Sequence, residues 1–128
     1  MSNAMKSDYV KMCDCEEIQR KRKDENGDHL YFKEYDAVMT VCGIDHCAMS
    51  FGYYDSLNSI WLPTQKQIQE MIGYEIKPGL MLCKFFAWYK YNRPSDIADE
   101  LDSMEELWLA FYMYGKNKKW NGDKWISI

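Results

Sequence analysis

The stretch from Ile60 to Tyr91 constrains the fold of this chain more than any other part of the sequence. Pro63 follows the extended pair Trp61-Leu62 and prevents it from continuing as a paired interior strand. Thr64 is a favourable helix N-cap, and Gln67 three residues later completes the pattern of a capping box. The apolar residues that follow recur on one helix face, at Ile68, Met71 and Ile72. The stretch therefore predicts a strand, a capped helix and a second core segment.

That second core segment, from Leu80 to Tyr91, is compatible with both a helix and a strand. Its length of about twelve residues favours a buried helix. The side chains that fit one helical stripe are Leu82, Phe85, Phe86 and Tyr89. A later segment is clearer, because Ser103 and Glu106 form a second capping-box pattern and the residues after them are apolar nearly all round. We expect a central buried helix there, ending at Gly115.

Short runs of strand-forming residues occupy the region before this stretch. They lie at residues 30–32, 37–42, 47–54 and 59–62, with charged or turn residues between them. Residues 7–23 predict one broken helix or two short ones. Near the end of the chain, Asn121-Gly122 marks a hairpin flanked by Trp120 and Trp125. The predicted fold class is α+β: a small antiparallel β-meander packed against three to four helices, with a C-terminal β-hairpin.

The length of 128 residues indicates a single α+β domain, which we place at residues 5–128. Residues 1–4 resemble the remnant of an expression tag, with Met5 as the natural start. The sequence contains no signal-peptide pattern and no run of about 18 apolar residues. We therefore expect a cytoplasmic protein that does not enter a membrane. The five cysteines are then expected to be reduced thiols.

The cysteines also raise the question of a zinc site. Cys13 and Cys15 form one close pair, and Cys42, His46 and Cys47 form a second group at a strand connection. Structural zinc takes four thiolate or imidazole ligands, usually from two such groups. The spacing is not that of a common zinc knuckle, and free cysteine is also among the most buried residue types. Zinc is therefore an alternative here, and buried or surface thiols are the favoured interpretation.

Charge and aromatic content bear on possible partners. The net charge is −4 and the isoelectric point is about 5.2, which gives no support for general phosphate-backbone binding. A basic stretch nevertheless surrounds the hairpin tryptophans, where Lys118 and Lys119 precede Trp120 and Trp125. Aromatic rings among lysines can stack on single-stranded nucleic acid. The favoured interpretation is that the tryptophans cover the core while the lysines stay in water, and the residues 20–23 are likewise solvated.

Nothing in the sequence predicts a catalytic residue. The two histidines are His29 and His46, and the neighbours His46 and Cys47 would point to opposite faces of a strand. A Cys–His nucleophile needs spatial contact and a third, orienting group. The glycines are isolated, so no phosphate-binding loop is present. We lean towards a protein that is not an enzyme.

Four segments together resemble a known group of proteins. They are residues 12–19, 61–65 together with 69–71, 103–111 and 119–125. The segments are similar to those of small uncharacterised proteins encoded by phages and prophages of Gram-positive bacteria, a family without an assigned function. The resemblance implies life in the cytoplasm of a bacterial host cell that carries phage, and it carries over no catalytic or binding residue.

The leading functional hypothesis follows from the excess of aromatic residues, which make up 16% of the chain. Exposed aromatic patches usually mark contact surfaces. We expect a non-enzymatic, phage-derived accessory protein that binds another protein or a second copy of itself. The alternatives are a zinc-stabilised binding module and single-stranded nucleic-acid binding through the basic Trp hairpin.

Overall fold

A computed structural model describes residues 8–41, 58–73, 76–91 and 101–128 of the chain. The chain divides into two compact units, Met1–Pro63 and Thr64–Ile128, and each is described by itself. The expectation of a single domain over residues 5–128 stays a prediction. Within the described residues, no helix has both the length and the apolar character needed to cross a bilayer.

The first unit begins with two short helices, α1 (Val10–Cys13) and α2 (Glu16–Gln19). This outcome matches the expectation of two short helices rather than one broken helix. Both helices contact strand β3 (Ser59–Leu62). Tyr9, fully buried at the start of α1, donates a hydrogen bond from its hydroxyl to the backbone oxygen of Pro63 at 2.6 Å. The N-terminal segment is therefore fixed to the end of β3.

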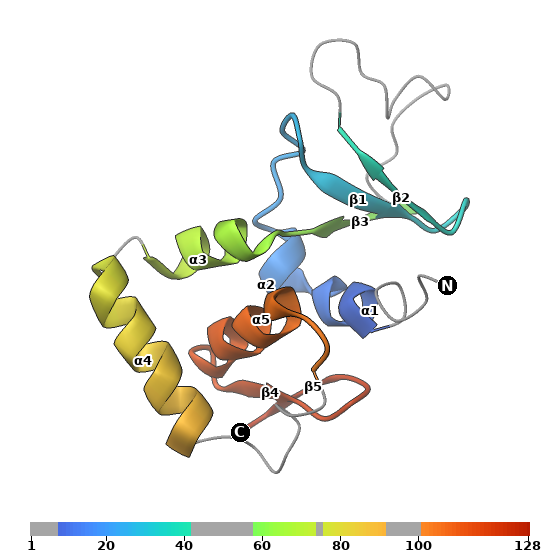
Figure 1. The fold of residues 1–128 in the computed structure, drawn as a ribbon. Coiled ribbons are helices and arrows are strands. Elements are labelled where there is room, and N and C mark those ends of the chain that lie inside the picture. The colour runs from blue at the N-terminus through green and yellow to red at the C-terminus, as the bar shows by residue number, and fades with distance from the viewer. Residues whose placement is uncertain (1–7, 42–57, 74–75, 92–100) are drawn as a thin grey trace. The chain divides into compact units, whose positions relative to one another are not determined.

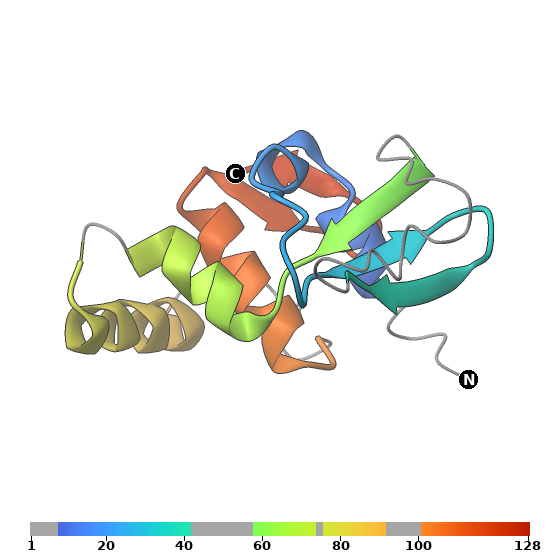
Figure 2. The same cartoon turned by 90° about the horizontal axis from the view of Figure 1, so that it is seen from above.

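The sheet of the first unit contains β1 (His29–Phe32), β2 (Ala37–Thr40) and β3 in the order β2-β1-β3. Both pairings are antiparallel, and Figure 2 shows β1 between its two neighbours. A simple meander would instead place the second strand in the middle. The predicted strand at residues 47–54 lies outside the described residues. β1 lies between the other two strands, and its alternate residues Leu30 and Phe32 are buried in the core.

The second unit contains α3 (Gln65–Gly73), α4 (Pro78–Tyr91) and α5 (Met104–Tyr114), followed by β4 (Lys118–Trp120) and β5 (Trp125–Ser127) (Figure 1). The capping box of α3 is confirmed, because Thr64 N donates to Gln67 Oε1 at 2.9 Å and Gln67 N donates to Thr64 Oγ1 at 3.2 Å. At α5, Glu106 N donates to Ser103 Oγ at 3.1 Å, which confirms the second predicted cap.

Helix α5 is the buried helix of the second unit, as the sequence predicts. Its most buried side chains include Trp108, Leu109 and Met113, and it contacts α3, α4 and β4. The buried carboxylate of Glu106 accepts a hydrogen bond from Asp102 N at 2.7 Å and so stabilises the start of the helix. The α+β class is thus confirmed, with antiparallel sheets and helices in both units.

The C-terminal hairpin also forms, although its connection is longer than the Asn-Gly pair alone. Trp120 pairs with Trp125, so the connection runs from Asn121 to Lys124. The Asn121 side chain accepts hydrogen bonds from the backbone amides of Asp123 and Lys124, both at 2.8 Å. Gly122 has a φ of +99°, a conformation that residues with a Cβ rarely adopt. These local bonds close a four-residue turn.

Candidate interaction surface

Among the described residues of the second unit, helix α4 contacts its neighbours through one side. On that side, Phe85 stacks on Trp108 with ring centroids 3.9 Å apart and also meets the edge of Phe111. Trp88 is buried next to Phe111 and Tyr114. Aromatic pairs of this kind stabilise a contact by about 0.5–1.5 kcal/mol each beyond the area that they bury. The cluster therefore anchors α4 against α5.

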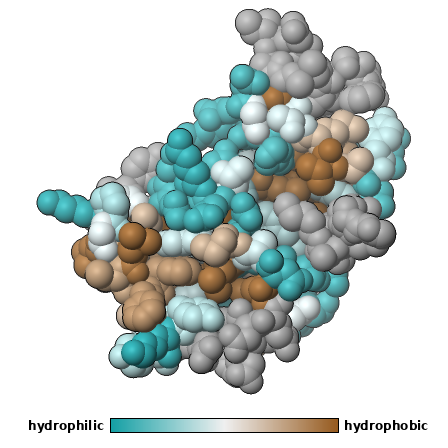
Figure 3. Space-filling model, viewed as in Figure 1, coloured by the Kyte–Doolittle hydropathy of each residue, from teal (hydrophilic) through white to brown (hydrophobic). Residues whose placement is uncertain are grey.

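The opposite side of α4 is apolar and exposed, which corrects the expectation of a buried helix. Leu80, Leu82 and Phe86 are 49%, 55% and 61% exposed, and Tyr91 is 74% exposed. Of the stripe expected to be buried, Leu82 and Phe86 point outward, while the inward positions include Met81 and Trp88. Figure 3 shows hydrophobic residues gathered at the surface over α4. Monomeric proteins rarely leave a continuous apolar helix face in water.

We name this surface the α4 outer face and define it by its exposed residues: Gly79, Leu80, Leu82, Cys83, Lys84, Phe86, Ala87, Lys90 and Tyr91. Residues four apart form rows along a helix. The middle row has three small residues, Gly79, Cys83 and Ala87, and ends at Tyr91; a Cβ added at Gly79 would meet no atom within 4 Å. The row on one side holds Leu82, Phe86 and Lys90, and the row on the other side starts with Leu80 and Lys84.

The charges on the α4 outer face are all positive. Lys84 and Lys90 are exposed, Lys77 precedes the helix, and residues 76–91 contain no acidic side chain. Neither Lys84 nor Lys90 forms an ion pair in the part of the chain that the structure describes. The Lys90 ammonium lies 5.8 Å from the Phe86 ring centroid and 5.4 Å from that of Tyr91. A cation is thus held over the apolar surface.

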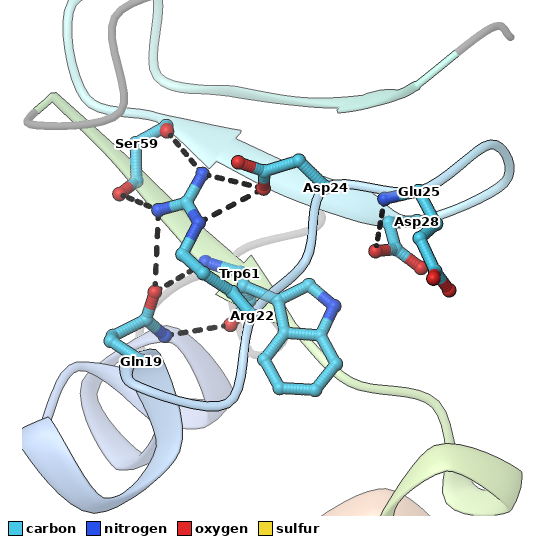
Figure 4. Close-up of polar contacts among 7 residues, drawn as sticks. All are labelled: Gln19, Arg22, Asp24, Glu25, Asp28, Ser59 and Trp61. Carbon is cyan, nitrogen blue, oxygen red and sulfur yellow. Dashed lines mark hydrogen bonds and ion pairs between the residues drawn. The ribbon is translucent and has the colours of Figure 1, made fainter.

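In the first unit, a polar cluster covers the outer edge of β3 (Figure 4). Gln19 Nε2 donates to the backbone oxygens of Trp61 and Cys13 at 2.9 Å, and Gln19 Oε1 accepts from Trp61 N at 2.9 Å. Arg22 donates to Ser59 O at 3.1 Å and to Ser59 Oγ at 3.0 Å. The amide of Gln19 therefore takes the place of a neighbouring strand at Trp61.

Arg22 belongs to the basic stretch 20–23, which the sequence predicts to be solvated, and here the structure differs. Its guanidinium forms an ion pair of 2.9 Å with Asp24, and the Arg22 side chain is only 13% exposed. This ion pair and the hydrogen bonds to Ser59 hold the Arg22 side chain at the outer edge of β3. Arg20, Lys21 and Lys23 remain exposed, as expected. We interpret the cluster as structural, because its donors are used within the protein.

Two of the five predicted metal ligands, Cys13 and Cys15, lie in the part of the chain that the structure describes. Cys13 is fully buried, and Cys15 is half-buried. Burial is the main cause that raises the pKa of the Cys15 thiol to about 11, and the Glu17 carboxylate adds to the effect. Across residues 8–41, 58–73, 76–91 and 101–128, no three His, Cys, Asp or Glu side chains converge as a metal site would require. Cys42, His46 and Cys47 lie outside these ranges, so the zinc hypothesis stays a prediction.

The predicted hairpin surface has one buried and one half-buried tryptophan. Trp120 is 6% exposed, and its ring meets that of Trp125 edge to face at a centroid distance of 5.0 Å. Lys119 is exposed and Lys118 is half-buried. Stacking on a base requires an open ring face, which Trp120 does not offer. The interaction role proposed for these four residues stays a prediction.

A hollow of about 390 Å³ lies where α3 ends and α4 begins. Its apolar lining includes Ile76, Pro78 and Met81, and its charged groups are Lys66 and Glu70, four residues apart on α3. This spacing is typical of a solvated helix face. We assign no ligand to the hollow.

Comparison of the chain with protein-family models gives no match. Curated proteins and solved structures likewise give no match.

Proposed function

We propose that this chain is a non-enzymatic accessory protein, phage-derived as its sequence resemblance implies, that works by binding another protein chain through the α4 outer face. The observation that supports the proposal is the exposure of Leu80, Leu82 and Phe86 on a helix whose other side is fixed to α5. These side chains are about half exposed, so burying the rest of one of them in an interface contributes about 0.8–1.5 kcal/mol. A partner gains this energy without any rearrangement of the aromatic cluster.

Site-specific photocrosslinking tests the proposal. A benzophenone amino acid is placed at Phe86, and the matched control carries it at Met104, an exposed apolar residue of α5. The protein is produced in Gram-positive cells and irradiated. We expect one discrete adduct from position 86, with either a second copy or one other protein, and no such adduct from position 104.

A second substitution on the same face makes the test decisive. Leu82→Glu should remove the adduct formed from position 86, because a carboxylate in an apolar interface is costly to desolvate. Leu82 is 55% exposed, so this change should alter the free energy of unfolding by no more than about 0.5 kcal/mol. The proposal is wrong if positions 86 and 104 give the same pattern, or if Leu82→Glu leaves the adduct unchanged.

The phage origin has its own test in the genes that flank the coding sequence. Neighbouring capsid, tail or integrase genes would support it, and a housekeeping operon would contradict it.

A further inference from the structure

We infer that the partner of the α4 outer face is an amphipathic helix whose apolar stripe is flanked by carboxylates. This inference depends on the proposed function and adds to it the chemistry of the partner. It starts from the distribution of charge, since every ionisable side chain of residues 76–91, apart from the thiol of Cys83 and the tyrosines, is a lysine.

The shape of the surface suits a helix. The small residues Gly79, Cys83 and Ala87 lie between two rows of larger side chains, and Tyr91 closes their row at the C-terminal end of α4. Small residues in such a row let a second helix approach closely over the first turns of α4. Helix α4 has 14 residues, so the surface is about 21 Å long, the length of a four-turn partner. Helices that dock in this way are held by apolar side chains at a spacing of three and four residues.

The position of the lysines then specifies the flanks of the partner. Lys90 continues the row of Leu82 and Phe86, and Lys84 continues the row of Leu80, so one ammonium stands on each side of the small residues. Lys90 is held over the rings of Phe86 and Tyr91, where a docked helix would bring its own flanking residues. Carboxylates at those places would pair with both lysines.

The same charges disfavour a second copy of this chain as the partner. Two α4 outer faces in contact would bring four ammonium groups together and no carboxylate from residues 76–91. Like charges that face each other across an interface oppose association. Electrostatic complementarity therefore favours an acidic partner over self-association.

Three synthetic 18-residue peptides test the inference by fluorescence anisotropy. The first has a leucine stripe at helical spacing with glutamates on both flanks, the second has lysines in place of the glutamates, and the third has the composition of the first in scrambled order. We expect the glutamate peptide to bind about tenfold more tightly than the lysine peptide at low salt, which corresponds to about 1.4 kcal/mol. The difference should shrink at high salt, and the scrambled peptide should not bind.

Charge-swap variants identify the lysines responsible. Lys84→Glu combined with Lys90→Glu should reverse the preference, so that the lysine peptide binds more tightly. The matched control, Lys119→Glu with Lys124→Glu, changes the net charge of the same unit equally at exposed positions outside α4 and should keep the original preference. A preference that moves equally in both variants would overturn the inference.

The remaining outcomes separate this inference from the proposed function. Equal binding of the glutamate and lysine peptides overturns the acidic partner and leaves the proposed function intact. Dimerisation of the purified chain without peptide binding does the same, with a second copy as the partner. Binding only to phosphatidylglycerol vesicles, lost in the Lys84→Glu, Lys90→Glu variant, overturns both. No peptide binding, a monomer at all concentrations and no adduct from position 86 also overturn both.

Discussion

Replacing Gln19 by alanine tests whether one side chain of α2 maintains the outer edge of β3. The amide of Gln19 forms three hydrogen bonds of 2.9 Å, two with the backbone of Trp61 and one with Cys13 O. Each such bond contributes about 1 kcal/mol to the free energy of unfolding. Trp61 is only 4% exposed, so water replaces these bonds poorly. We expect Gln19→Ala to lower the free energy of unfolding by about 3 kcal/mol.

Amide hydrogen exchange gives the sharpest measurement, because it reports on single residues. Lys33 N donates to Asn58 O, which shows that the backbone groups of residue 58 point towards β1. Hydrogen-bonded pairs alternate along an antiparallel ladder, so the backbone amides of Ile60 and Leu62 also point towards β1. Trp61 N points away from β1 and donates to Gln19. In Gln19→Ala, the Trp61 amide should exchange faster than the Ile60 amide, whereas the wild type protects both.

Glu16→Ala is the matched control for this experiment. Glu16 lies on the same short helix and is exposed, so its replacement should change the free energy of unfolding by less than about 0.5 kcal/mol. The reasoning is refuted if Gln19→Ala costs no more than Glu16→Ala, or if Trp61 and Ile60 lose protection together.

Two further predictions concern a helix cap and a thiol. Ser103→Ala should lower the free energy of unfolding by about 1 kcal/mol, because Glu106 N loses its acceptor; urea denaturation measures the change, and Ser103→Thr should restore most of it. Burial raises the pKa of Cys15 from 9.0 to about 11, so the thiol stays protonated up to a higher pH in the folded chain than in the unfolded chain. The contribution of the protonated Cys15 thiol to the free energy of unfolding is fully present below pH 9, and it is lost as the pH rises towards 11. Denaturation curves at pH 8 and pH 10.5 should therefore show a smaller decrease for Cys15→Ala than for the wild type, and an equal decrease would contradict the assignment.

The helix caps could be predicted from the sequence because they are local. Thr64 with Gln67 and Ser103 with Glu106 are pairs three residues apart, and a helix start alone brings such pairs together. The hairpin could likewise be predicted from the local pair Asn121-Gly122, although the side chain of Asn121 extends the turn to four residues. Local signals of this kind identified the elements and their class.

The orientation of α4 could not be predicted, since a run that is apolar on all sides has no polar face to indicate its phase. The stripe chosen from spacing included Leu82 and Phe86, which are exposed, and omitted Trp88, which is buried. The pairing of Gln19 with Trp61 was equally hidden, because it joins residues 42 positions apart. Neither a glutamine nor an arginine in a charged stretch signals such a long-range contact.

The arrangement at Trp61 has a consequence for how these molecules behave at high concentration. Sheets grow into fibrils when an edge strand with unsatisfied amides recruits an identical strand from another chain. On β3 the amide and carbonyl of Trp61 are already engaged by Gln19, and the carbonyl of Ser59 by Arg22. The polar side chain of Gln19 on α2 thereby opposes the addition of a strand from another chain at this edge. The apolar side chains of β3 remain packed in the core.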